Sequence, residues 1–215
     1  MQRSARPLIV LGVAVLVALA LAAGCGGASP APAATPVPAA SAAPDGAPAP
    51  ASLPVADGVI TAGEYAHSVE VAGVTVHWTN DASHLYLAAE APAAGWVAVG
   101  LDPERRMQGA NYIFALLAEG APTVIDAYGT APTGAHPADT DLGGTSDIVA
   151  ASAALLADSA RLEAQIPLDS GDKFDRPLAP GGSYTIIAAY GPPGGGAEAH
   201  HVSRGSGTIA LDATP

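Results

Sequence analysis

The sequence has 215 residues and a formal net charge of −12, from 8 basic and 20 acidic side chains. Two of the basic residues, Arg3 and Arg6, lie close to the N-terminus, so the rest of the chain carries 6 − 20 = −14. This balance argues against nucleic acid as a partner, because phosphates are bound by basic surfaces. Aromatic residues make up only 5% of the chain, so any core must rest on aliphatic side chains. The length suits one modest domain with appended segments.

The N-terminal residues have the pattern of an export signal. Residues 1–24 begin with basic side chains, continue with an apolar stretch and end in small residues, which is typical of a signal peptide. The alternative is an uncleaved anchor, since the apolar run is long enough to span a bilayer. Residues Leu21–Cys25 resemble the lipoprotein box of bacteria, although that box more often has leucine in the place of Ala22. The resemblance implies lipid on Cys25 and a domain held outside the cytoplasm on a bacterial membrane.

Cys25 is the only cysteine, so the sequence has neither a disulfide pair nor a Cys-x-x-Cys-His motif for covalent haem attachment. Beyond it, eight of the 27 residues in 28–54 are proline and nearly all the others are small. A segment of this composition cannot bury a core and is typical of an extended, disordered linker. We therefore expect a lipidated cysteine and linker at 25–54, followed by a folded domain at 55–212.

The remaining 158 residues have the pattern of short strands separated by turns. In VTVHWT (74–79), three apolar residues alternate with polar ones, and HLYLAAEA (84–91) repeats the pattern after an Asn-Asp turn. Further strands are expected at 95–101, 111–117, 122–128, 147–154, 160–166, 183–190 and 206–212. The stretch 150–165 is rich in alanine and leucine and could be mistaken for a helix. The spacing predicts an all-β fold, an antiparallel immunoglobulin-like β-sandwich of about ten short strands.

Catalytic motifs such as Gly-x-Ser-x-Gly and His-Glu-x-x-His are absent, which favours a carrier or binding module over an enzyme. Met107 is the only methionine after the initiator, and it lies in a polar loop directly after a strand. A thioether paired with an imidazole can bind haem iron or copper, whereas the alternative for Met107 is a gap-filling hydrophobe. His200 and His201 are adjacent, so on an extended strand their rings would point to opposite faces.

Other polar residues receive a simpler interpretation. Asp169, Asp172 and Asp175 resemble a calcium loop only loosely, and the spacing of an EF-hand is missing. A turn held by aspartate side chains is the favoured interpretation. The remaining histidines are expected to be exposed polar residues: His67, His77, His84 and His136.

Five segments together resemble DOMON domains, in the order seen in that family: DGVITAGEY, VHWTNDASHLYLAAEAPAAGWVAVGL, MQGANYIFA, LDSGDKFD and HHVSRGSG. The resemblance spans about residues 55–212 and implies a β-sandwich. Haem-binding members, similar to the cytochrome domain of cellobiose dehydrogenase, hold haem b non-covalently between a methionine and a late histidine. The matching positions are Met107 and His200, and the spacing to Arg204-Gly205 selects His200 over His201. An aspartate common in the family is replaced here by Asn111.

The resemblance implies a membrane-tethered electron carrier that exchanges electrons with a redox partner protein in the cell envelope. Arg204 would then pair with a haem propionate, whereas Arg105 and Arg106 are expected to be ordinary surface residues and Trp96 a core residue. One alternative is a carbohydrate-binding module on the same sandwich. Another is a copper site formed by Met107 with His200 and His201.

Overall fold

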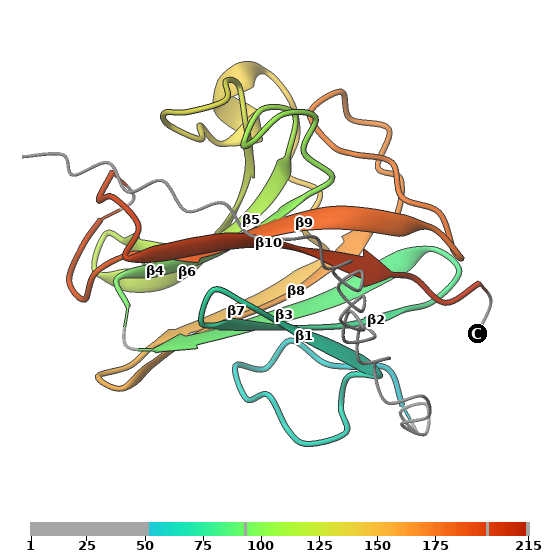
Figure 1. Ribbon diagram of the computed structural model, residues 1–215, viewed down its shortest axis with the longest axis horizontal. Coiled ribbons are helices and arrows are strands. Elements are labelled where there is room, and N and C mark those ends of the chain that lie inside the picture. The colour runs from blue at the N-terminus through green and yellow to red at the C-terminus, as the bar shows by residue number, and fades with distance from the viewer. Residues whose placement is uncertain (1–51, 93, 197, 214–215) are drawn as a thin grey trace, which may run out of the picture. The chain divides into compact units, whose positions relative to one another are not determined.

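The computed structural model describes residues 52–92, 94–196 and 198–213. The described part is all-β and consists of two five-stranded antiparallel sheets that face each other (Figure 1). The predicted sandwich is therefore confirmed. The predicted signal peptide, Cys25 and the linker up to residue 51 lie outside the described residues. Among the described residues, none belongs to a helix with the length and apolar character needed to cross a membrane.

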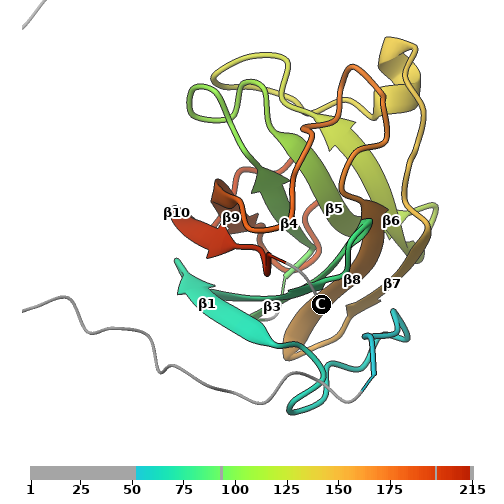
Figure 2. The same cartoon turned by 90° about the vertical axis from the view of Figure 1, so that its right-hand side faces the viewer.

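The first sheet has the strand order β1(His67–Val71), β2(Val74–Asn80), β3(His84–Pro92), β8(Ser159–Pro167) and β7(Ala150–Leu155). The second sheet has the order β10(Ser203–Ala210), β9(Ser183–Tyr190), β4(Trp96–Leu101), β5(Asn111–Ala118) and β6(Ala121–Tyr128). A short 3-10 helix, η1(Asp139–Leu142), follows β6. Figure 2 shows the two layers from the side, with long connecting loops gathered above the ends of β4, β5 and β6 of the second sheet.

All nine strands expected from the sequence are present, and β1 is an additional one. The last strand begins three residues earlier than expected, at Ser203. The helix-like stretch 150–165 forms the hairpin β7–β8, in which Leu155 pairs with Ala160 across a tight turn. Its alternate residues Ala160, Leu162 and Ala164 are buried, which is the period of a strand and outweighs the helix preference of alanine and leucine.

The main core lies between the sheets and is built from alternate residues of both. Val97, Val99 and Ile113 of the second sheet are fully buried in it, together with Leu85 and Leu87 of the first. Since successive side chains of a strand point to opposite faces, the residues between them must face outward.

The outward face of the second sheet is also buried, which is unusual for an antiparallel sheet with one face on the core. All six residues of β4 and the first six of β5 are buried. Their outward side chains form a second apolar cluster that includes Trp96, Tyr112 and Phe114. Long loops must therefore cover this face, and they do so incompletely, leaving the candidate site.

Candidate functional site

An apolar depression lies on the outer face of the second sheet. Ala98 of β4 pairs with Ala189 of β9 on one side and Phe114 of β5 on the other. The two methyl side chains lie among larger rings and leave space above the centre of the sheet. Two hollows of about 380 and 550 Å³ open there and share six lining residues, so we treat them as one site, the outer pocket. Volumes of this size are typical of cofactor and small-ligand sites.

Met107 lies on the loop between β4 and β5 and lines both hollows. It occupies a tight turn in which the backbone N–H of Gln108 donates to the carbonyl of Arg105 at 3.1 Å. Arg106, the residue before it, has a positive φ of 56°. The carbonyl oxygen of Met107 lies against Gly129, where an added Cβ would come within 1.7 Å of it. This close contact fixes the height of the methionine above the sheet.

His200 and His201 lie in an irregular segment just before β10 begins at Ser203. Both rings line the larger hollow, with centroids 6.4 Å apart and planes at 79°. The expectation of opposite faces applied to an extended strand, and it does not hold here because His200 and His201 lie outside β10. His201 also lines the smaller hollow. The structure thus brings both histidines to Met107's pocket, and the choice between them stays a prediction.

Trp96 holds this histidine segment in place. Its Nε1–H donates to the carbonyl of Ala199 at 3.2 Å, directly before His200. The ring lies across Gly191, where a Cβ would come within 2.0 Å of Nε1. Trp96 is buried, as expected, but it also lines the larger hollow and is a wall of the pocket.

His136 is a pocket residue that the sequence did not reveal. Its ring lies on that of Tyr112, with centroids 4.3 Å apart, and it lines the larger hollow. Its Nδ1 is buried and has no hydrogen-bond partner among the described residues. Burial lowers the pKa of His136 and so favours the neutral imidazole that a metal requires. We expected an exposed polar residue, and the surrounding Gly/Pro-rich loop carries no periodicity that could have predicted the contact with β5.

The comparisons with known proteins agree with this architecture. A family model of the DOMON domain matches residues 71–191, more than half of the chain. The chain belongs to the DOMON family. The matched region contains Met107 and ends before His200 and Arg204.

Solved structures similar to this DOMON chain share little sequence with it. The cytochrome b domain of pyranose dehydrogenase from Coprinopsis cinerea is 11% identical, with a TM-score of 0.45 over 64% of this chain and 76% of that one. The cytochrome domain of cellobiose dehydrogenase from Myriococcum thermophilum is 13% identical, with a TM-score of 0.47 over 68% of this chain and 82% of that one. A family 9 carbohydrate-binding module from Caldicellulosiruptor kristjanssonii, in complex with glucose, is 16% identical, with a TM-score of 0.41 over 76% and 94%. No curated protein sequence matches the chain significantly.

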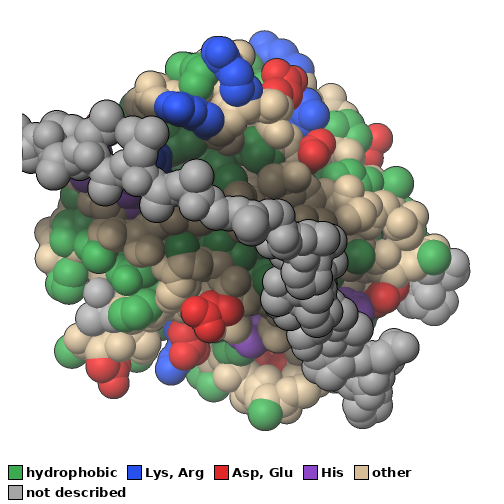
Figure 3. Space-filling view, viewed as in Figure 1, with side chains coloured by type: hydrophobic (Ala, Val, Ile, Leu, Met, Phe, Trp, Pro, Cys, Tyr) green, Lys and Arg blue, Asp and Glu red, His purple; other side chains and the backbone are tan. Residues whose placement is uncertain are grey.

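Positive charge lies at the rim of the outer pocket of this DOMON domain. Arg204 of β10 pairs in register with Ala189, so its exposed side chain leaves the sheet on the pocket side and lines both hollows. Arg106 lines the smaller hollow, which departs from the ordinary surface position expected of it, whereas Arg105 is exposed and bonds Gln108. In the described part of the chain, neither Arg106 nor Arg204 forms an ion pair. Figure 3 shows Lys and Arg side chains along the upper rim of this side, above a hollowed apolar area.

The residues of the outer pocket fit a haem. The floor is apolar, the walls carry one thioether and three imidazoles, and free guanidinium groups lie at the rim for carboxylates. Burial also raises the pKa of Tyr112, so its hydroxyl stays protonated in the pocket.

Proposed function

We propose that this DOMON protein binds haem b non-covalently in the outer pocket and carries electrons, with Met107 and His200 as axial ligands. The observation that carries the proposal is the convergence of Met107, His200 and Arg204 on one apolar pocket, although the β4–β5 loop that carries Met107 and the segment that carries His200 and Arg204 lie far apart in the sequence. Family membership supports it, because the DOMON match includes Met107, and the resemblance to haem-binding members implies Met107 and His200 as the ligands. His201 is the alternative ligand.

The pocket residues would set the properties of the bound group. Haem iron supplies a one-electron redox centre, and ligands on both sides leave no open position for oxygen or substrate. The thioether of Met107 would favour ferrous iron and raise the potential, and the imidazole of His200 would be the second ligand. The rings of Trp96 and Phe114 would exclude water from the floor, and Arg204 would pair with a propionate.

The N-terminal segment completes the proposal. Lipid on Cys25 would anchor the domain on the outer side of a bacterial membrane, and the proline-rich linker would let it move between a donor and an acceptor protein of the cell envelope.

The test begins with the absorption spectrum of full-length protein produced with haem available. A sharp Soret band of six-coordinate, low-spin haem, extractable by acidified organic solvent, is expected. Met107→Ala should shift the reduced spectrum and lower the potential, and an unchanged spectrum and potential would remove Met107 from the site.

Matched histidine variants then identify the second ligand. His200→Ala should abolish the low-spin spectrum, whereas His201→Ala and His136→Ala should retain it. If only His201→Ala abolished the low-spin spectrum, His201 would be the ligand. If only His136→Ala abolished it, the ligand would be His136, on the loop after β6. A protein without a visible band in all forms would refute haem binding.

Copper is the second candidate, because Met107, His200 and His201 line the same hollow and provide the soft and imidazole ligands that copper prefers. Copper titration of haem-free protein, followed by the same three variants, would separate the two metals. The carbohydrate alternative lacks comparable support: Trp96, Tyr112 and Phe114 are each at most 6% exposed and offer no open aromatic platform.

A further inference from the structure

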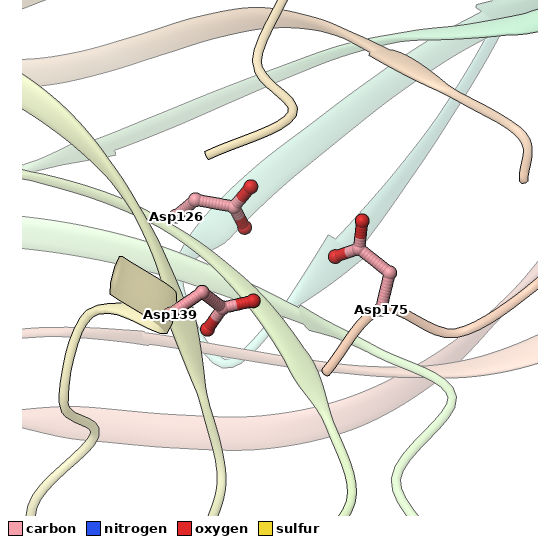
Figure 4. A group of neighbouring side chains, drawn as sticks. All are labelled: Asp126, Asp139 and Asp175. Carbon is pink, nitrogen blue, oxygen red and sulfur yellow. The ribbon is translucent and has the colours of Figure 1, made fainter. Parts of the chain in front are cut away.

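Three aspartates converge on the side of the second sheet that faces away from the outer pocket. Asp126 lies on β6, where its neighbour Ile125 lines the pocket and Asp126 points the other way. Asp139 is the first residue of η1, and Asp175 lies in the loop between β8 and β9. One carboxylate oxygen of each lies within 4.8 Å of the others. Figure 4 shows the three carboxylates turned toward a common point.

These carboxylates are withdrawn from water. Asp126 is 4% exposed, Asp139 is 0% exposed, and Asp175 is half-buried. Few donors compensate for this burial. Asp126 Oδ2 accepts the backbone N–H of Asp147 at 2.9 Å, and Asp175 accepts the amide of Asn111 at 2.6 Å and the hydroxyl of Ser170.

Several acceptor oxygens at this place have no donor at all. Both oxygens of Asp139, Oδ1 of Asp126 and Oδ1 of Asn111 are buried and without a hydrogen-bond partner among the described residues. Buried polar groups are almost always paired, so these four acceptors call for a hydrogen-bond donor or a cation that the described residues do not supply. Asn111 indicates a missing partner independently of the aspartates, since its side chain is uncharged. Its Nδ2 donates to Asp175, while its Oδ1 has no hydrogen-bond partner among the described residues.

Among the described residues, no basic side chain forms an ion pair with the cluster. Within the described ranges, the ion pairs involve Arg161, Arg176, His67 and His84, and none of them reaches these aspartates. Asp147 and Asp172 add further negative charge nearby. Burial, and after it the neighbouring carboxylates, raises the pKa of both Asp126 and Asp139 to about 7. The site therefore lacks a positive charge at its centre.

We propose that Asp126, Asp139 and Asp175 bind a calcium ion, with Oδ1 of Asn111 as a fourth side-chain oxygen. The proposed ligand atoms are all oxygens, which favours a hard cation over zinc or copper. They come from four separate chain segments, β5, β6, η1 and the β8–β9 loop, which suits calcium better than magnesium, because magnesium demands a near-ideal octahedron. The ion would connect β6, η1 and the β8–β9 loop through charges that otherwise repel one another.

Isothermal titration of the chelator-treated full-length chain with CaCl₂ tests the proposal. One calcium per chain is expected. Free calcium at 100 times the dissociation constant should raise the folding equilibrium constant about 100-fold, seen as a higher thermal midpoint than in EDTA. Absence of binding heat, equal midpoints in calcium and EDTA, or equally tight binding of MgCl₂ would overturn it.

A matched pair of variants assigns the effect to the cluster. Asp139→Asn keeps the size of the side chain but removes one buried charge, so it should weaken calcium binding at least tenfold and abolish the calcium-dependent midpoint shift. In EDTA it should be no less stable than the parent, which distinguishes a lost ligand from a damaged fold. Asp141→Asn makes the same charge change at an exposed position of the same helix and should bind like the parent. Equal weakening by both variants would overturn the assignment. These outcomes do not depend on haem.

Discussion

The clearest test of how the fold positions Met107 is the substitution Gly129→Ala. Gly129 is buried directly after β6, and it exchanges backbone hydrogen bonds with the Met107 loop, accepting from Gly109 at 2.8 Å and donating to Ala110 at 2.9 Å. Its φ lies outside the left-handed region, so an alanine here would be destabilising because of a steric clash and not because of its backbone conformation.

The expected effect follows from one distance. An alanine Cβ would lie 1.7 Å from the carbonyl oxygen of Met107, whereas ordinary contact begins at 3.4 Å. The turn carrying Met107 must therefore lift away from the sheet, with the two hydrogen bonds strained or lost. Overpacking of this kind costs about 1–3 kcal/mol of unfolding free energy. The thioether remains in the chain but no longer reaches its place in the pocket.

Two measurements check this reasoning. Urea unfolding should show the loss of stability, and the spectrum should lose low-spin haem character as it does in Met107→Ala. Gly196→Ala is the control, because a Cβ there meets no atom within 4 Å. If Gly129→Ala retained the parent spectrum and stability, the close contact would not determine where Met107 lies, and this account of the turn would be refuted.

The remaining predictions concern the pocket floor, the carboxylates and the tether. Ala189→Leu should reduce haem affinity at least tenfold by filling the floor, while Thr185→Leu, on the same face of β9 but outside the pocket, should not, as haem titration would show. In EDTA, the pKa values of Asp126 and Asp139 are raised from the usual 3.8 to about 7, so folding takes up protons between these two pH values. The free energy of unfolding should therefore fall as pH rises through this range, by about 1.4 kcal/mol per pH unit for each titrating group. Urea unfolding at several pH values would show this fall. Saturating calcium should remove this fall. Cys25→Ser should release the protein from membranes or block its processing, and unchanged fractionation would refute the lipid tether.

Much of the fold was predictable because strand alternation is a local signal. Val97 and Val99 alternate with Trp96 and Ala98, and both sets are apolar, a pattern typical of a strand with two covered faces. β1 was missed since its sequence HSVEV is short, half polar and at a sheet edge. The start of β10 was missed because Gly205 and Gly207 carry no side chain to reveal a pattern.

The site was less predictable, because it depends on which distant segments meet. Met107 was singled out by its scarcity and its polar setting, and it does line the pocket. His136 could not be found, since its contact with Tyr112 joins a loop to a strand that lies more than twenty residues earlier. Asp126 carries a usable signal in the sequence: it alternates with Val124 on the inward face of a strand, where a charge needs a partner. Asp139 offered none.

One segment connects the two proposed sites, which leads to a last prediction. Residues 129–139 begin at Gly129, which holds the Met107 turn, and end at Asp139 in the carboxylate cluster; His136 lies between them. Calcium bound at Asp139 would order this covering segment and should tighten haem binding, and linkage requires haem to tighten calcium binding by the same factor. Haem titrations in calcium and in EDTA measure the coupling, with Asp139→Asn as the variant that should show none. Equal haem affinity in both conditions would show that β6 alone holds the pocket wall, independently of the carboxylates.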